Sequence, residues 1–244
     1  MIYITGDTHG SFERFAKIRD FCKRYGTTTK DTMIILGDSG INYYEDARDN
    51  QLKDFITTIP ITFFCIHGNH EQRAECLKSY EFRYDNEYYY TISEEQYPNI
   101  QFALDDYYYV IEGKPFIVYG GGYSVDKEMR IMMQAAGYSG YKYWENELPS
   151  DEIINEWRQS IQVIKNNSFY SDSIILSHTC PKKYTPYEAF LPNIDQSKVD
   201  TRLEEFLDEV EETLDYRDWY CGHFHINKNI DKIHFLFDDI VEVK

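Results

Sequence analysis

Most of the histidines in this chain lie in or beside short polar motifs that directly follow apolar runs. The stretch DWYCGHFHINK places His223 and His225 two residues apart, after a run that ends in Cys221 and Gly222. We predict that the run Trp219-Tyr220-Cys221 is a short buried strand, so the two imidazoles should project together from its end. Such a pair is a metal site when other ligands converge on it, and otherwise an ordinary partly buried pair.

Four other apolar runs end in motifs of the same kind. These motifs are GDTHG with Asp7 and His9, GDSG with Asp38, GNHE with Asn69 and His70, and ILSHTCP with His178. Ligands in open α/β sheets gather outside the carboxyl ends of the strands, where loops from distant parts of the sequence meet. Carboxylate, imidazole and amide oxygen suit borderline divalent metals such as manganese, iron and zinc. Because no thiolate is among these groups, a closed structural zinc site is disfavoured.

The elements predicted around these motifs indicate an α/β fold. Apolar IYIT, a helix from about Ser11 to Tyr25 and the fully apolar run MIIL alternate as in a βαβ unit. A second helical stretch and the strand ITFFCI complete a βαβαβ start. The predicted apolar stripes of the two helices are Phe12, Phe15, Ile18 and Cys22, and Leu52, Phe55, Ile56 and Ile59.

The rest of the chain predicts a strand-rich middle followed by two further helices. Tyrosine clusters lie at Tyr88 to Tyr90 and Tyr107 to Tyr109, and a hairpin is predicted over YYYVIEGKPFIVYGGG with its turn at Gly113. Ser150 caps a helix. The strand SIILSH separates this helix from the next, and KIHFLFDDIVEV is typical of closing strands. The two helical stripes are Ile153, Ile154, Trp157, Ile161 and Ile164, and Leu203, Phe206, Leu207, Val210 and Leu214. With no internal repeat or clear linker, we predict one domain over residues 1–244.

Composition and charge exclude several classes of protein. The formal net charge of −17 over 244 residues repels nucleic-acid phosphates, and we find no basic stripe that would override it. No window approaches the length of a membrane span, and MIYITGDTHG lacks the basic start and cleavage site of a leader. The five cysteines are odd in number and scattered, which suits reduced thiols. We therefore expect a cytoplasmic protein that contacts neither extended nucleic acid nor a membrane.

Taken in order from Asp7 to His225, the blocks GDTHG, GDSG, GNHE, SH and GHFH resemble the calcineurin-like metallophosphoesterase superfamily in its bacterial or phage form. Each block alone is common, but five in order at predicted strand ends are specific. The resemblance implies a two-sheet β-sandwich flanked by helices, with two metals at its edge. It also implies that the chain hydrolyses phosphate esters.

The resemblance further implies a role for each motif residue. One metal would be held by Asp7, His9 and His225, the other by Asn69, His178 and His223, and Asp38 would bridge them. A hydroxide between two divalent ions of manganese, iron or zinc would attack phosphorus directly. His70 would protonate the leaving oxygen or stabilise its developing charge.

Departures from the resemblance leave the substrate open. Ser/Thr protein phosphatases of the superfamily carry an arginine after their second block, whereas this chain has GDSGINYYED. They have a second arginine where this chain has His67, although Glu71 matches their form of the third block. Monoesters and diesters both remain possible substrates. A non-catalytic metal-binding scaffold and a mononuclear hydrolase of another fold are the alternative classes.

Four residues outside the ligand set are candidate substrate contacts. His67 either touches the phosphate or is an ordinary loop histidine. In the segment GGGYSVDKEMR, Tyr123, Lys127 and Arg130 either contact substrate or form surface ion pairs. The tyrosine clusters either stack against a substrate ring or fill the core of a sheet.

Overall fold

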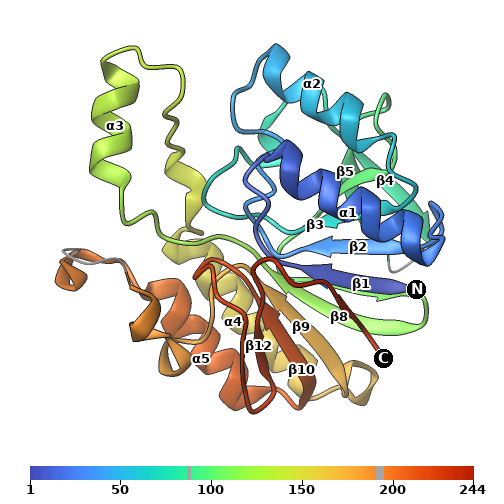
Figure 1. The fold of residues 1–244 in the computed structure, drawn as a ribbon. Coiled ribbons are helices and arrows are strands. Elements are labelled where there is room, and N and C mark those ends of the chain that lie inside the picture. The colour runs from blue at the N-terminus through green and yellow to red at the C-terminus, as the bar shows by residue number, and fades with distance from the viewer. Residues whose placement is uncertain (87–88, 191–194) are drawn as a thin grey trace.

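A computed structural model describes residues 1–86, 89–190 and 195–244. Within these ranges the chain forms two mixed sheets and five α-helices (Figure 1). The helices are α1 (Phe12–Tyr25), α2 (Ala47–Ile56), α3 (Lys127–Ala135), α4 (Asp151–Lys165) and α5 (Arg202–Thr213). Short 3-10 helices span Ala74–Cys76, Glu145–Glu147, Ser168–Tyr170, Lys182–Tyr184, Tyr187–Ala189 and Gln196–Lys198.

The first sheet has seven described strands in the order β13-β1-β2-β3-β6-β5-β4. In this order they span Val241–Glu242, Ile2–Thr5, Thr32–Ile35, Thr62–Cys65, Ile100–Ala103, Tyr89–Ser93 and Glu81–Asn86. Strands β1, β2, β3 and β6 are parallel, with Ile4 opposite Ile34 and Ile34 opposite Phe64. The carboxyl ends of β1, β2 and β3 therefore lie at one edge of the sheet.

The second sheet has six described strands in the order β11-β12-β10-β9-β8-β7. In this order they span Lys228–Ile230, Ile233–Phe235, Tyr216–Cys221, Ser173–Ser177, Lys114–Tyr119 and Tyr107–Ile111. Strands β8, β9, β10 and β12 are parallel, and β7 and β8 form the predicted hairpin around Gly113. The predicted closing strands are divided, because β12 joins this sheet whereas β13 pairs with β1.

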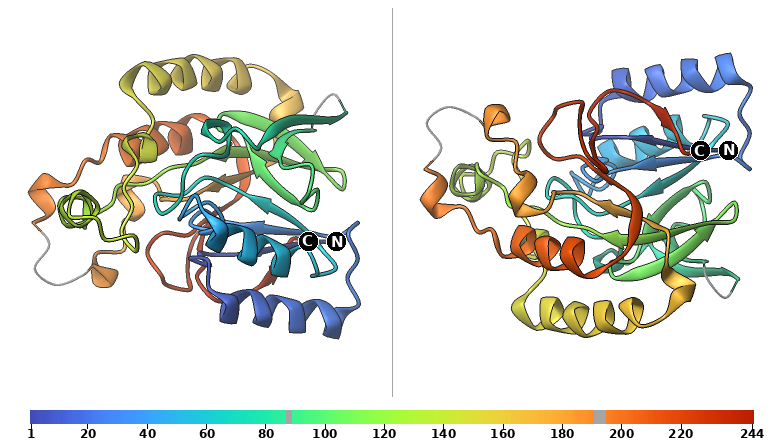
Figure 2. Two further views of the ribbon diagram at one scale, coloured as in Figure 1. Left: turned by 90° about the horizontal axis from the view of Figure 1, so that it is seen from above. Right: turned by 90° about the horizontal axis from the view of Figure 1, so that it is seen from below.

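Buried side chains hold the two sheets face to face. Alternate residues of β1 point to opposite sides of the first sheet: Ile4 packs with Val118 and Leu176 of the second sheet, whereas Tyr3 packs on the helix side. Figure 2 shows the blue helix α1 and the olive helix α4 on opposite outer sides of the sheets. The order of layers is therefore α1 and α2, first sheet, second sheet, α4 and α5, which confirms the predicted sandwich flanked by helices.

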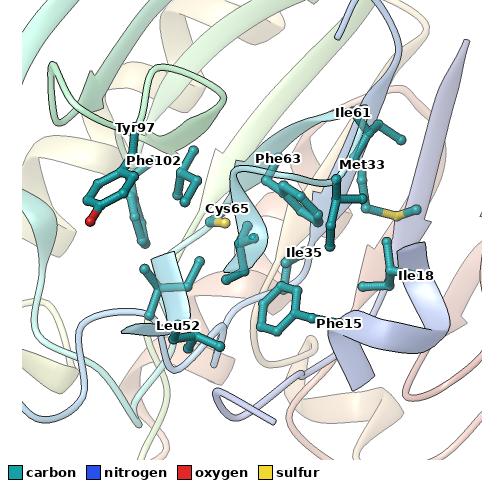
Figure 3. Close-up of a cluster of buried hydrophobic side chains, with 14 of the residues drawn as sticks. Phe15, Ile18, Met33, Ile35, Leu52, Ile61, Phe63, Cys65, Tyr97 and Phe102 are labelled. Carbon is teal, nitrogen blue, oxygen red and sulfur yellow. The ribbon is translucent and has the colours of Figure 1, made fainter. Parts of the chain in front are cut away.

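The outer face of the first sheet carries the core that α1 and α2 cover (Figure 3). Phe15 and Ile18 of α1 pack on Met33 and Phe63, as the predicted stripe requires. Phe12, which we also placed on that stripe, is 51% exposed. It lies in the first turn of the helix, beside the strand-end loops rather than over the sheet, and that prediction was wrong.

The helices over the second sheet follow their predicted stripes with one exception. Ser150 caps α4 by accepting a hydrogen bond from the Ile153 amide, and Ile154, Trp157 and Ile161 are buried. Ile153 is 41% exposed, so its predicted burial was wrong. One residue turns an α-helix by about 100°, and the neighbouring Ile154 occupies the inward position instead.

Helix α3 was not predicted, and it projects away from both sheets (Figure 1). Arg130 is its buried residue, while apolar Met129 and Met132 are exposed.

The tyrosine clusters partly fill the sandwich: Tyr109 is fully buried, and Tyr88 lies outside the described residues. The five cysteines, all of them in the described ranges, are free. In the described part of the chain, none of the helices combines the length and the apolarity needed to cross a membrane.

Candidate metal centre

The five motif loops meet at one edge of the sandwich, where the carboxyl ends of strands from both sheets come together. A hydrogen bond joins the two sheets here: the His223 amide, after β10, donates over 3.0 Å to Oδ1 of Asp7, after β1. Within the second sheet, the Gly222 amide donates to the His178 carbonyl over 2.9 Å. Motifs more than 200 residues apart in sequence therefore share one small region, as the strand-end argument predicts.

Asp7, His9 and His225 form the first group of potential ligands. The two imidazoles approach with their Nε2 atoms 2.8 Å apart, and His225 Nε2 lies 3.2 Å from Asp7 Oδ2. His9 Nε2 lies 3.7 Å from the same oxygen. One ligand atom from each residue falls within 4.8 Å of the others, which is close enough for one ion to contact all three.

A second group surrounds His178. Its Nε2 atom lies 2.9 Å from Asn69 Oδ1, 3.3 Å from His223 Nδ1 and 3.5 Å from Asp38 Oδ1. The Leu36 carbonyl accepts a hydrogen bond from His178 Nδ1 over 2.7 Å, which leaves Nε2 as the atom that faces the site. Asn69 Nδ2 donates to Ser124 Oγ over 2.9 Å and so turns the amide oxygen towards His178.

Asp38 lies between the two groups. Its Oδ1 atom accepts hydrogen bonds from the Asn69 and His70 amides, each over 2.7 Å, and its Oδ2 atom is 3.9 Å from His9 Nδ1. Asp7, Asp38 and His178 also bring ligand atoms within 4.8 Å of one another. A carboxylate in this position has neighbours in both groups.

These residues fit a divalent metal. Asp7 Oδ2 is a buried carboxylate oxygen that accepts no hydrogen bond, an arrangement that is costly unless a cation contacts it. The surrounding donors are imidazole nitrogens, carboxylate oxygens and an amide oxygen, the set that manganese, iron and zinc share. Among the described residues, the groups of potential ligands contain no cysteine.

The electrostatics of the group are governed by burial and by the two aspartates. Burial disfavours the charged form of Asp38, but the charge of His178 outweighs it and holds the pKa of Asp38 well below its usual value. Burial also opposes the charge of His178, yet Asp38 raises the pKa of His178 to about 9. For His223, burial and then His178 lower the pKa to about 3. The site thus keeps its carboxylates ionised.

Four site residues adopt backbone conformations that are uncommon for residues other than glycine. The φ angles are 48° at His9, 47° at Asp38, 65° at His223 and 53° at His225. Left-handed conformations cost free energy that the surrounding structure must supply, and they cluster at functional sites. Here they occur in the loops that carry the potential ligand atoms.

Two glycines allow the loops to approach the aspartates closely. A Cβ atom on Gly222 would lie 2.3 Å from Asp7 Oδ1, and one on Gly68 would lie 2.1 Å from Asp38 Oδ1. Both distances are far below van der Waals contact, so only glycine fits without displacing a carboxylate.

Glu71 braces the loop that carries Asp38, a role that we did not predict from the sequence. Its buried carboxylate accepts hydrogen bonds from the Ser39 and Gly40 amides over 3.2 and 3.1 Å, and from the Ser39 hydroxyl. Burial raises the pKa of Glu71 to about 7. The position of Glu71 beside His70 in the GNHE motif was the available signal, but the partners of the carboxylate become visible only in the fold.

His70 brings a ring nitrogen within 4.8 Å of ligand atoms of His9 and Asp38, and it also contacts Arg130. Its ring centroid is 5.2 Å from that of His9, and Arg130 Nη2 is 2.6 Å from His70 Nε2. Burial lowers the pKa of His70 to about 4; the charge of Asp38 opposes this shift and that of Arg130 adds to it. Asp126 and the Lys142 carbonyl, at 3.0 and 3.1 Å, hold the guanidinium in place.

The four candidate substrate contacts occupy different places. Tyr123 lines a cavity beside the groups of potential ligands. Arg130 is buried, contacts His70 and also forms an ion pair with Asp126. Lys127 lies over the Tyr143 ring, with Nζ 5.0 Å from its centroid. His67 is 5% exposed and is not among the described residues that line the cavities at the site, which favours its alternative as a loop histidine.

Two cavities open beside the ligand groups. The larger, of about 730 Å³, is bounded by Asp38, Asn69, His223 and His225 on one side and by residues of segments 123–126, 182–190 and 196–204 on the other. The smaller, of about 430 Å³, is bounded by His9, Phe12, the region around Tyr43 and Tyr44, and Gly140. His70 lines both.

The fold and site together define an α/β sandwich with a metal-binding edge. Comparison with protein families is consistent with this: the family described as calcineurin-like phosphoesterase matches residues 1–227, and the chain belongs to that family. Membership indicates metal-dependent hydrolysis of phosphate esters.

Solved structures show the same fold at low sequence identity. The crystal structure of TT1561 from Thermus thermophilus matches 97% of this chain and 87% of its own, with 12% identity and a TM-score of 0.52. A second solved structure matches 96% of this chain and 88% of its own, with 9% identity and a TM-score of 0.52. A comparison with curated proteins found no match.

Proposed function

We propose that this protein is a hydrolase of phosphate esters that works with two divalent metal ions. The observation that carries the proposal is the position of Asp38, whose two carboxylate oxygens face His9 on one side and His178 on the other. In this proposal Asp7, His9 and His225 hold one ion and Asn69, His178 and His223 the other. Bound there, two divalent ions would acidify a water molecule and polarise the phosphoryl oxygens.

The chain itself orients the ligand atoms before any substrate arrives. The Asn69 and His70 amides fix one oxygen of Asp38, the His223 amide fixes one oxygen of Asp7, and the Leu36 carbonyl fixes the ring of His178. Hydrogen bonds of this kind set the direction of each ligand and usually affect affinity strongly when they are lost.

His70 is the residue that we propose assists the leaving group. Its ring lies beside His9 and at the boundary between the two cavities, where a phosphoryl group near the ligands would come within reach. A neutral imidazole carries one N–H, so His70 can donate a hydrogen bond to the leaving oxygen even with a low pKa. Arg130, held against the ring, adds positive charge at the same place.

The alternatives have less support. A Ser/Thr protein phosphatase would grip the phosphoryl group with arginines, and here Arg130 and Arg48 already pair with Asp126 and Asp46. A scaffold without catalysis would not need His70 and its buried partner Arg130. A mononuclear hydrolase would not need a second group of potential ligands around His178.

The experiment is a metal titration joined to an activity assay. We expect about two manganese ions per chain and chelator-sensitive hydrolysis of aryl phosphate esters. Asp38→Asn should lower occupancy of both ions, because a neutral amide oxygen is a weaker ligand than a carboxylate. Asp218→Asn, on β10 and outside the groups of potential ligands and the described cavity lining, is the matched control. Retention of two ions by Asp38→Asn would exclude the bridging role, and one ion in the unaltered protein would favour the mononuclear alternative.

A further inference from the structure

We infer that the substrate is a small phosphodiester whose two organic groups occupy the two cavities, with an aromatic or apolar group in the larger one. This inference rests on the proposed function and names its substrate class. The first observation is that the cavities share a wall: His70 lines both, while four of the proposed ligands line the larger and His9 lines the smaller. A phosphoryl group at the ligands would therefore have a cavity on each side.

The number of organic groups follows from this arrangement. A phosphate monoester has one organic group, which would leave one of the two cavities without any part of the substrate. A diester has two and would place one in each. Cavities of about 730 and 430 Å³ are of the size that encloses small organic groups and not a folded protein surface.

The wall of the larger cavity favours an aromatic or apolar group. Tyr123, Tyr187, Phe190 and Phe224 contribute rings to it, and Ile226 adds an aliphatic side chain. Phe190 and Phe224 are nearly parallel, with an interplanar angle of 13°. Aromatic rings bind flat or apolar groups by stacking and by removing apolar surface from water.

The charges around the cavities also favour a diester, which carries one negative charge where a monoester carries up to two. The cations among the described lining residues are Lys182 and Arg48. Lys182 Nζ already binds Glu205, and Arg48 Nη2 binds Asp46, each over 2.7 Å. Neither is free to neutralise a second phosphoryl charge, and the larger cavity also contains the carboxylates of Asp126 and Glu204.

The test compares three esters on the manganese-loaded full chain: bis(4-nitrophenyl) phosphate, methyl 4-nitrophenyl phosphate and 4-nitrophenyl phosphate. We expect kcat/KM to be highest for the first and at least tenfold lower for the monoester. Phe190→Ala, which removes part of the larger wall, should lower kcat/KM for the bis-aryl diester at least fivefold, mainly through KM.

Gly140→Phe tests the smaller cavity. Gly140 lines this cavity, and a Cβ atom added to it meets nothing within 4 Å, so a larger side chain starts in open space there. It should lower kcat/KM for the bis-aryl diester at least tenfold, while the metal content stays that of the parent. Val163→Phe is the matched control, since Val163 is 65% exposed and lies outside the described lining of both cavities.

The outcomes separate this inference from the proposed function. Monoester preference, or a Gly140→Phe protein with the diester rate of the parent, would overturn the inference and leave the phosphoesterase intact. Absence of turnover on all three esters with two metals bound would overturn the proposed function and, with it, the inference.

Discussion

At the scale of single residues, His70 differs from the proposed metal ligands around it. It lies next to Asn69 in sequence, yet its side chain contacts Arg130. We expect His70→Ala to keep both metals and to lose about a hundredfold or more in kcat, because general acid assistance typically contributes this much. Metal analysis and the initial rate on one aryl ester check the two parts separately.

A comparison of two leaving groups on the His70→Ala protein distinguishes a chemical role of His70 from a structural one. An ester with a good leaving group needs little assistance, so the loss in His70→Ala should be smaller for 4-nitrophenyl than for phenyl esters. His234→Ala, a histidine on β12 that pairs with Asp218, is the control. Equal losses on both esters would mean that His70 only supports the loop.

The convergence of the proposed ligand residues could be predicted from the sequence because each follows an apolar run and belongs to a motif of fixed spacing. The strand-end argument alone predicts that Asp7, Asp38 and His178 lie close together. Glu71 and Arg130 could not be assigned in the same way. The roles of these two residues depend on which backbone amides and which imidazole the fold brings to them, and those contacts lie 31 and 60 residues away in sequence.

At the scale of elements, the site depends on strand ends from two sheets that fit closely against each other. Gly222 follows β10 of the second sheet and contacts Asp7 after β1 of the first. We expect Gly222→Ala to weaken metal binding at least tenfold and to cost about 1–3 kcal/mol of stability, as overpacking usually does. Metal titration and chemical denaturation measure the two effects.

Gly140→Ala is the matched variant for this prediction. Its added methyl group meets nothing within 4 Å, so metal affinity and stability should stay within about 0.5 kcal/mol of the parent. If Gly222→Ala bound metal as tightly as Gly140→Ala, the close approach of the loop to Asp7 would not be what holds that carboxylate in place.

The elements themselves were predictable to the extent that one face of each is buried. The parallel strands and α1, α2, α4 and α5 follow from apolar periodicity. Helix α3 could not be predicted from apolar periodicity. Its buried residue is Arg130, and its exposed apolar residues form no stripe against a sheet. The errors at Phe12 and Ile153 both fall in first turns of helices, but they have different causes. Phe12 lies beside the strand-end loops, whereas Ile153 is turned outward because the neighbouring Ile154 occupies the inward position.

At the scale of the whole molecule, buried ionisable groups connect stability to pH in two opposite directions. Burial raises the pKa of Glu71, Asp106 and Glu204 to about 7, so each binds its proton more tightly in the folded state. Burial lowers the pKa of His70 and His223, so these bind protons less tightly when folded. As pH rises, these carboxyl groups reduce stability, and so does His178, whose pKa is raised to about 9, whereas His70 and His223 increase it. A stability curve of the unaltered protein alone would therefore show partial cancellation.

A comparison with Glu204→Gln isolates one carboxyl group. The unfolded pKa of a glutamate is about 4.5 and that of Glu204 is about 7, so the stability this group contributes at low pH is lost between those two values. Glutamine keeps an acceptor for the hydrogen bond that Thr179 Oγ1 donates to Glu204 Oε1 over 2.9 Å, and it carries no charge. The variant should therefore gain stability relative to the parent between pH 5 and pH 8, by up to about 3 kcal/mol at about 1.4 kcal/mol per pKa unit.

Chemical denaturation of both proteins at pH 5 and pH 8, with the same metal content, gives the stability of the variant relative to the parent at each pH. The change in this relative stability between the two pH values is the predicted gain. The histidine contributions are common to the two proteins and cancel, which leaves the cost of ionising one buried carboxyl group. Glu209→Gln, which replaces a partner of Arg158 on the surface of α5, should show less than about 1 kcal/mol of such change. A Glu204→Gln protein that followed the parent at both pH values would mean that the carboxyl group ionises without penalty, and that the wall of the larger cavity is open to water at this point.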